Sequence, residues 1–470
     1  MKRQITLILG GMFGLVAVVA GLFWAFNLYP TGRAFEPTIL PSPSDRSEAI
    51  RQDLTALRKL PDIDRAFTPA ARVAFEREID ELSQRAGTLD PARFELGVAR
   101  AVALADNAHT NARGITYGVG FNVLPLRLAW FSDGLYVVAA QGALKEIVGA
   151  RVTELDGHDP ESLATRFAQY VGGPPQYRRR FALNLMVTPE AMMAAGVGRS
   201  PTSIELRLVL RDGRSMRRLF PVGSSPMWRS LGPGMAPENA LNPARGEAVP
   251  EGWAHVLDAV TAPLAMQNAE RWYWKTWPDA ETLYVQIDRV ISANDGLGLD
   301  GFLAGALAEA EAKKPRYAIV DLRMAPGGNY LLTSDFANRL PQLIRSDGKI
   351  FILVSPVTFS AALVTAARLK HFAGERGIMI GESMGDRPIF WAEGGVGVLP
   401  NSKLAIRYST AWHDWKSGCA LTDFSRCYWL NILKGVAAGN LDPAVETPST
   451  FQDYAAGHDP AMEAVERLKQ

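Results

Sequence analysis

The pattern of apolar and polar positions changes several times along the chain, and each change marks a predicted unit. An almost uninterrupted apolar run over residues 5–26 comes first. Apolar residues then recur at helical spacing from residue 45 to about 86 and again over 91–104. One face of the first of these stretches carries Leu54, Leu57 and Leu60. The pattern predicts a membrane-length helix, a Pro-containing linker and a small helical segment.

Short alternating strands and Gly turns replace the helical pattern from Gly118 to about Val222. Residues 149–157 and 204–210 are both typical of strands, and each meets an Asp-Gly turn. A region this small and rich in strands is predicted to be an independent module. The stretch after it, over residues 223–272, begins rich in Pro, Gly and Asn and is predicted to be a linker or excursion.

From Thr282 onward predicted strands alternate with predicted helices. The strands are expected over residues 283–290, 317–323, 350–355 and 378–381, and the helices over 300–314 and 360–372 with one more before residue 350. This alternation requires crossover connections, so it predicts an α/β core with a largely parallel sheet covered on both faces. The predicted domains are 1–30, 31–115, 116–222, 223–272 and 273–470.

The N-terminal apolar run is long enough to cross a membrane. As a helix it would measure roughly 33 Å, against a hydrocarbon core of about 30 Å. Lys2 and Arg3 precede it, and a positive flank stays in the cytoplasm. A cleaved signal peptide ending near Ala20 is the alternative, but the run continues beyond that point. We therefore expect a single-pass anchor in the inner membrane and a main body that is periplasmic or otherwise extracytoplasmic.

The composition of the chain excludes some classes of function. The chain has 50 Lys+Arg against 49 Asp+Glu, a net charge of +1, which lacks the electrostatic footprint of a nucleic-acid-binding protein. Six histidines and two cysteines leave little room for a zinc cluster, so no metal or organic cofactor is expected. Cys419 and Cys427 lie close together, which suits a local disulfide in an oxidising compartment, and two buried free thiols are the alternative.

Two loops of the predicted core follow strand ends, where reactive groups gather in open α/β sheets. In residues 321–328 a Pro-Gly-Gly turn lets backbone N–H groups face outward, as an oxyanion hole requires, although it is equally typical of an ordinary turn. In residues 354–362, Ser360 is expected at the first turn of a helix, where the positive end of the helix dipole favours an anion. Ser360 or Thr358 could instead be an N-cap.

A third segment lies far upstream, in Asp106-Asn107-Ala108-His109-Thr110. A lone histidine is more often structural than catalytic. Taken together, however, the three segments resemble the S41 family, the tail-specific or C-terminal processing serine peptidases and their tricorn-like relatives. The resemblance is carried by the motifs at 106–110, 321–328, 358–362 and 381–385, by a PDZ-like segment at 149–157, and by the C-terminal stretch.

The resemblance implies a parallel-sheet core of ClpP/crotonase type and a PDZ-like β-rich domain. It places the nucleophile at Ser360 and the oxyanion donors at Gly327 or Gly328 with the N–H of Ala361. One departure stands out, because the processing-protease branch has a Lys base where this chain has Asp386. His109 is then the expected base, since a neutral imidazole accepts a proton near neutral pH.

A histidine base needs an acid to orient it. Asp414, between Trp412 and Trp415, is the expected partner, with Asp423 as the alternative, and His413 is a weaker alternative base. The predicted function is a membrane-anchored, extracytoplasmic serine endopeptidase that acts on peptides or proteins. The alternatives are a catalytically inactive relative that binds a peptide or ligand, and an acyl-CoA-type enzyme with the same oxyanion architecture.

Overall fold

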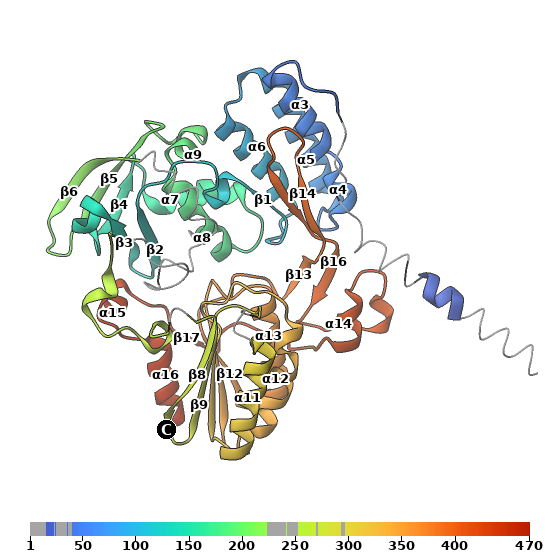
Figure 1. Ribbon diagram of the computed structural model, residues 1–470, viewed down its shortest axis with the longest axis vertical. Helices are drawn as coiled ribbons and strands as arrows, with labels where there is room; N and C mark the ends of the chain where they lie inside the picture. The colour runs from blue at the N-terminus through green and yellow to red at the C-terminus, as the bar shows by residue number, and fades with distance from the viewer. Residues whose placement is uncertain are drawn as a thin grey trace, which may run out of the picture.

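The computed structural model describes residues 16–22, 24, 35, 40–222, 241, 252–268, 271–292 and 297–470. The predicted N-terminal span and most of the predicted linker at 223–272 lie outside these residues. Within the described part of the chain, no helix has both the length and the apolar character needed to cross a bilayer. Three regions, a helical region, a β-rich region and an α/β core, pack around one another (Figure 1).

Three of the four helices of the helical region begin at a residue whose side chain caps the helix. Asp45, Thr68 and Asp90 each accept a hydrogen bond from a backbone N–H of the helix that follows, and Pro stands at the start of two of these helices. The helices are α3 (Arg46–Leu57), α4 (Leu60–Ile63), α5 (Pro69–Gln84) and α6 (Pro91–Ala103). The helical segments predicted at 45–86 and 91–104 are confirmed.

The β-rich region is an antiparallel sheet in the order β2-β3-β4-β5-β6, with β7 paired to β3. Its strands are β2 (Leu126–Phe131), β3 (Gly134–Gln141), β4 (Arg151–Leu155), β5 (Ser203–Val209), β6 (Ser215–Pro221) and β7 (Trp253–His255). The sequence analysis did not predict the helices between β4 and β5. They are α7 (Pro160–Phe167), α8 (Pro175–Met186) and α9 (Pro189–Ala194).

The core sheet runs β17-β12-β11-β10-β9-β8, and all its neighbours are parallel except β8 and β9. Its strands are β8 (Tyr273–Asp279), β9 (Thr282–Ile287), β10 (Tyr317–Asp321), β11 (Lys349–Val354), β12 (Gly377–Gly381) and β17 (Val445–Glu446). The helices α11 (Gly298–Lys313), α12 (Leu331–Leu343) and α13 (Ala361–Ala373) cover one face, and α16 (Pro460–Lys469) covers the other (Figure 1). The α/β class is confirmed.

Burial on both faces explains why the central strands of the sheet are mostly apolar. In β10, Val320 packs against α11–α13, whereas its neighbour Ile319 packs against α16. In β11, Ile352 and Phe351 divide between the two faces in the same way. Successive strand side chains point to opposite faces, so a sheet covered twice needs apolar residues at nearly every position.

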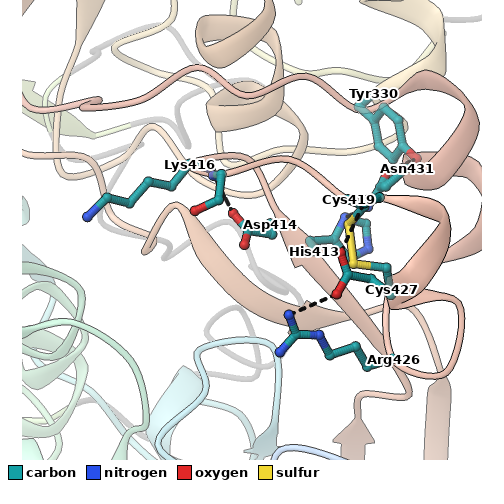
Figure 2. The surroundings of a disulfide bond; sticks show 11 residues. Tyr330, His413, Asp414, Lys416, Cys419, Arg426, Cys427 and Asn431 are labelled. Carbon is teal, nitrogen blue, oxygen red and sulfur yellow. Dashed lines mark hydrogen bonds and ion pairs between the residues drawn. A yellow bond between two sulfur atoms is a disulfide. The ribbon is translucent and has the colours of Figure 1, made fainter.

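Between β12 and β17 the chain leaves the core and returns. It forms the antiparallel pair β13 (Ile389–Ala392) and β16 (Ala411–Asp414), and the hairpin of β14 (Gly395–Val398) and β15 (Ala405–Tyr408). Strand β1 (Asn111–Arg113), just after α6, pairs with β15 and so ties the upstream histidine segment to this excursion. Two further short helices follow, α14 (Trp429–Lys434) and α15 (Phe451–Ala455). The predicted disulfide between Cys419 and Cys427 is confirmed and lies between β16 and α14 (Figure 2).

A partly buried glutamate on α6 leads to a prediction about stability. Glu95 accepts a hydrogen bond from the Ile115 N–H at 2.8 Å, and burial raises its pKa from 4.5 to about 7. Between pH 4.5 and 7 the folded protein therefore holds a proton that the unfolded chain has lost. The contribution of Glu95 to the free energy of unfolding is therefore full below pH 4.5. It is lost as the pH rises from 4.5 to 7, and the total loss is about 1–3 kcal/mol.

The Glu95→Gln variant keeps an acceptor oxygen and cannot ionise. We expect it to exceed the wild type in free energy of unfolding by about 1–3 kcal/mol at pH 8 and to match it near pH 4.5, as measured by urea denaturation. Glu81→Gln, on the exposed side of α5, should show no such pH dependence. A Glu95→Gln variant that is no more stable than wild type at pH 8 would contradict the assignment.

Candidate active site

The loop between β11 and α13 holds Ser360 in an unusual backbone conformation. Its φ of 54° and ψ of −121° lie in a region that favours glycine. Ser360 occupies the N-cap position of α13, but its side chain makes no capping hydrogen bond. The N-cap alternative considered for Ser360 is therefore wrong, because its hydroxyl does not satisfy the helix start.

Thr358 fixes this loop to the neighbouring strand end. Its hydroxyl donates to the Leu322 carbonyl at 2.9 Å and accepts from the Ser355 N–H at 2.9 Å. On the backbone, the Phe359 N–H donates to the Ala325 carbonyl at 3.1 Å. The alternative in which Thr358 caps the helix is excluded as well, since its hydroxyl bonds elsewhere. These bonds hold Ser360 in its strained conformation.

The two glycines of the Pro-Gly-Gly turn have different neighbours. A Cβ on Gly327 would lie 2.8 Å from the Ser360 Cβ and 3.3 Å from the Ala361 nitrogen, so this turn approaches the start of α13 closely. A Cβ on Gly328 would instead lie 2.1 Å from the Val290 carbonyl oxygen. Both have positive φ, of 108° and 143°. Gly327 therefore lies against Ser360, whereas Gly328 lies against Val290.

His109 lies in the loop between α6 and β1 and is 3% exposed. Its ring is stacked between the rings of Phe359 and Phe390, at centroid distances of 4.5 and 5.0 Å. Phe359 directly precedes Ser360, so the imidazole lies beside the nucleophile loop. Asn107 anchors the histidine loop to β13, since its Nδ2 donates to the Trp391 carbonyl at 3.0 Å.

The carboxylate nearest to this imidazole belongs to Asp386. Its Oδ2 lies 3.6 Å from the His109 Nδ1, and the Asp386 side chain is 2% exposed. Its Oδ1 accepts from the Arg387 N–H at 2.9 Å, and the Ser360 N–H also faces the carboxyl group. Asp386 thus contacts both the segment that carries the predicted base and the residue predicted as nucleophile.

Burial sets the charge state of this pair. Burial lowers the pKa of His109 well below 6.5, and the positive charge of Arg407 acts in the same direction. Burial raises the pKa of Asp386 well above its ordinary value, against the opposing effect of the Arg387 and Ser360 N–H groups. The imidazole is therefore neutral at pH 7, which is the form that accepts a proton.

Ser360 and His109 are not hydrogen-bonded to one another in this conformation. Among the residues that the structure describes, neither ring nitrogen of His109 has a hydrogen-bond partner. The Nδ1 of His109 and the Oδ2 of Asp386 are also slightly too far apart for such a bond. Catalytic hydrogen bonds are often long before substrate binds and shorten in the complex, so this arrangement is compatible with activity.

Asp414 has other partners. Its Oδ1 accepts from the backbone N–H of Lys416 at 3.1 Å and of Ser417 at 2.7 Å, an arrangement typical of a turn (Figure 2). His413 is also buried, with its Nε2 3.4 Å from Glu393 and its Nδ1 2.9 Å from the Asn431 amide. Both histidines belong to a column of stacked aromatic rings. In order, its members are Phe359, His109, Phe390, His413 and Tyr428.

Asp386 is the site residue that sequence reasoning missed. Its position drew attention only as the place of a missing lysine base. The signal was nevertheless present, because a carboxylate at that position can orient a histidine that comes from elsewhere. The two phenylalanines around His109 gave no signal in the sequence, since apolar residues of this kind usually belong to the core.

A buried ion-pair network supports the loops from below. The Arg323 guanidinium bridges Asp321 at 2.6 Å and Asp459 at 2.7 Å, and the Asp321 carboxylate also accepts from the Tyr284 hydroxyl at 2.9 Å. Asp459 is the N-cap of α16. The Ser355 hydroxyl donates to the Arg323 carbonyl at 2.6 Å, which connects the network to the nucleophile loop.

Comparison with known proteins places this geometry in context. No family model matches the chain, and no curated protein matches its sequence. A structure of mature CPAF complexed with lactacystin aligns with 90% of this chain and 98% of its own, at 15% identity and a TM-score of 0.56. Mature CPAF alone gives the same identity and TM-score over 97% of its chain. A putative S41 protease from Bacteroides fragilis covers 92% of this chain at 10% identity, but its TM-score of 0.34 is too low to carry an argument. The chain therefore has the fold of mature CPAF, in agreement with the resemblance of its motifs to the S41 peptidases.

Proposed function

We propose that the chain is a serine peptidase in which Ser360 is the nucleophile, His109 the general base and Asp386 the acid that orients the imidazole. One observation carries the proposal. An uncapped serine with a glycine-like backbone conformation stands at the start of α13, next to a buried neutral imidazole that itself faces a buried carboxyl group. Such a nucleophile, base and orienting acid are the three parts of a serine-hydrolase triad.

The proposed reaction follows from these roles. Ser360 Oγ attacks the peptide carbonyl as His109 Nε2 takes its proton, and the imidazolium then protonates the leaving amine. For this step the 3.6 Å gap between His109 Nδ1 and Asp386 closes to a hydrogen bond from the Nδ1–H, which leaves Nε2 as the accepting nitrogen. The backbone N–H groups of Gly327 and Ala361 are the proposed oxyanion donors, because Gly327 lies against both Ser360 and Ala361. Water then hydrolyses the acyl-enzyme by the same steps.

Asp386 and Asp414 can be separated by experiment. We expect Asp386→Asn to lower kcat by about 10²–10⁴-fold, because the asparagine keeps an acceptor oxygen but no longer stabilises the imidazolium. Asp414→Asn is the matched control and should stay within about threefold of wild type. The measurement is the rate at which a fluorophosphonate probe labels the protein, with hydrolysis of a peptide library as the second readout. Equal losses in the two variants would contradict the assignment to Asp386.

The second candidate function is a catalytically inactive relative that binds peptides. The observation that favours it is the missing hydrogen bond between His109 and Ser360. Labelling of the wild-type protein decides between the two. A peptidase should take up one fluorophosphonate per chain at Ser360, whereas a binding protein should remain unlabelled yet retain peptides.

The proposal extends to the cellular setting and to the β-rich region. The main body of the protein is periplasmic or otherwise extracytoplasmic in this proposal, and the N-terminal apolar run is its anchor. The disulfide supports the location, because disulfides persist in oxidising compartments. Extraction of membranes at alkaline pH tests the anchor, since an integral protein stays in the pellet. We further propose that the β-rich region acts as a PDZ-like module and presents an extended peptide by strand addition.

A further inference from the structure

Three arginines from separate elements gather beside the candidate active site. They are Arg113 on β1, Arg180 on α8 and Arg407 on β15. In the β1–β15 pair Asn111 lies opposite Arg407, so Arg113, two residues along, shares the face of Arg407 as its diagonal neighbour. Burial raises the pKa of the phenol of Tyr117, just after β1, and the charges of all three arginines act against that rise. We call these three residues the arginine cluster.

The cluster keeps polar atoms buried without partners. Arg180 is 8% exposed, lies over the rings of Tyr177 and Phe181 at 5.3 and 5.2 Å, and donates from Nη1 to the Pro356 carbonyl at 3.3 Å. Its Nε is buried and has no hydrogen-bond partner, and the same is true of the Arg407 Nε. Burial and the charge of Arg113 both lower the pKa of Arg407.

No carboxylate among the described residues forms an ion pair with any of the three. The charge of Glu393 acts on Arg407 in the direction that raises its pKa, but Glu393 and Asp386 each face a histidine. Asp386 faces His109, and Glu393 lies 3.4 Å from the His413 Nε2. By contrast, other arginines of this region are paired, since Arg387 binds Asp106 at 3.0 Å. Burying Arg180 and the Nε of Arg407 without an ion-pair partner is costly, and the cost is offset when an anion arrives.

The arginine cluster lies next to both reactive residues. Tyr177 connects them, because Arg180 lies over its ring, its ring stacks on Phe359 at 5.1 Å and its hydroxyl donates to the Ala108 carbonyl at 3.4 Å. Phe359 and Ala108 directly precede Ser360 and His109 in the sequence. A group held by the cluster therefore lies within a few residues of the scissile bond in an extended peptide.

We propose that Arg113, Arg180 and Arg407 form a subsite for a carboxylate of the bound peptide. Guanidinium groups bind carboxylates through paired, charge-assisted hydrogen bonds, and this geometry gives specificity as well as affinity. The carboxylate comes either from an Asp or Glu side chain or from the peptide C-terminus. The inference rests on the proposed function only in taking a peptide as the ligand.

Peptide binding to the full chain with Ser360→Ala tests the subsite without requiring catalysis. The immobilised protein is offered a synthetic octapeptide library, half with free C-termini and half amidated, and retained peptides are identified by mass spectrometry. We expect an enrichment of about fivefold or more for Asp and Glu over Asn and Gln if side chains are bound, or of free over amidated peptides if the C-terminus is bound. Either result supports the carboxylate subsite and identifies its source.

Variants assign the preference to the cluster. Arg407→Met and, separately, Arg113→Met should reduce the enrichment to near unity, and Arg407→Lys should restore part of it. Arg218→Met, at an exposed position on β6, is the control and should leave the enrichment unchanged. Arg113 is exposed, so its variant is expected to fold even if Arg407→Met does not.

The possible outcomes separate the subsite from the peptidase. No retained peptides, retention without a carboxylate preference, or a preference that survives both methionine variants would overturn the subsite. Fluorophosphonate labelling of the wild-type protein is scored independently. Labelling without a carboxylate preference leaves the peptidase standing and removes the subsite. A preference without labelling keeps the subsite and removes the peptidase.

Discussion

Replacing Ser360 by alanine is expected to abolish fluorophosphonate labelling and to lower peptide hydrolysis by at least about 10⁴-fold. The change removes the only atom that forms the proposed covalent bond, and no other group of the site can take its place. Labelling followed by peptide mapping should recover the probe on Ser360 in the wild type and on no residue in the variant. The loss should appear in kcat, because the hydroxyl acts in the transition state.

The same loop supplies a matched control. Ser355 also carries a hydroxyl, but that hydroxyl donates to the Arg323 carbonyl and holds the loop to the neighbouring strand end. Ser355→Ala should lose about 1 kcal/mol of stability and still be labelled. Persistent labelling of the Ser360→Ala variant, or loss of labelling in Ser355→Ala alone, would remove Ser360 from the mechanism.

Replacing His109 by phenylalanine is expected to slow labelling by about 10³-fold or more. A phenyl ring keeps the stacking between Phe359 and Phe390 but has no nitrogen to take the proton, so the change tests chemistry rather than packing. Because burial lowers the pKa of His109, the wild-type labelling rate should stay constant as the pH falls through 6.5 and decline only at lower pH.

His413 is the control for this second experiment. It is as buried as His109 and stacks on the opposite side of Phe390, at 4.9 Å. His413→Phe should therefore cost similar packing changes and leave the labelling rate within about threefold of wild type. If His413→Phe abolished labelling and His109→Phe did not, the roles of the two histidines would have to be exchanged.

The core could be predicted because its strands and turns are determined by short stretches of sequence. A strand such as β10, apolar up to its last residue, Asp321, and followed by a Pro-Gly-Gly turn, has few alternatives to a buried parallel strand. The disulfide was predictable for a related reason, since two cysteines eight residues apart in sequence lie within reach of one another. Helices α7–α9 were missed because they interrupt a region whose turns and strands otherwise follow the pattern of a sheet.

The site was harder to predict because it depends on contacts between distant segments. Asp386 has no distinguishing neighbours in the sequence, and its importance appears only when His109 is brought to it by the pairing of β1 with β15. The aromatic residues around Asp414 indicated a dry site, but the carboxylate turns toward backbone N–H groups instead. The choice between these two aspartates rests on tertiary geometry.

The attachment of the histidine loop to β13 has a mechanical consequence. Asn107 bonds to Trp391 in both directions, and Phe390 beside it covers one face of the imidazole. Any displacement of the β13–β16 ribbon would therefore pull the histidine loop along with it. The imidazole would then change its position relative to Ser360 together with the ribbon, rather than by rearrangement of a single side chain.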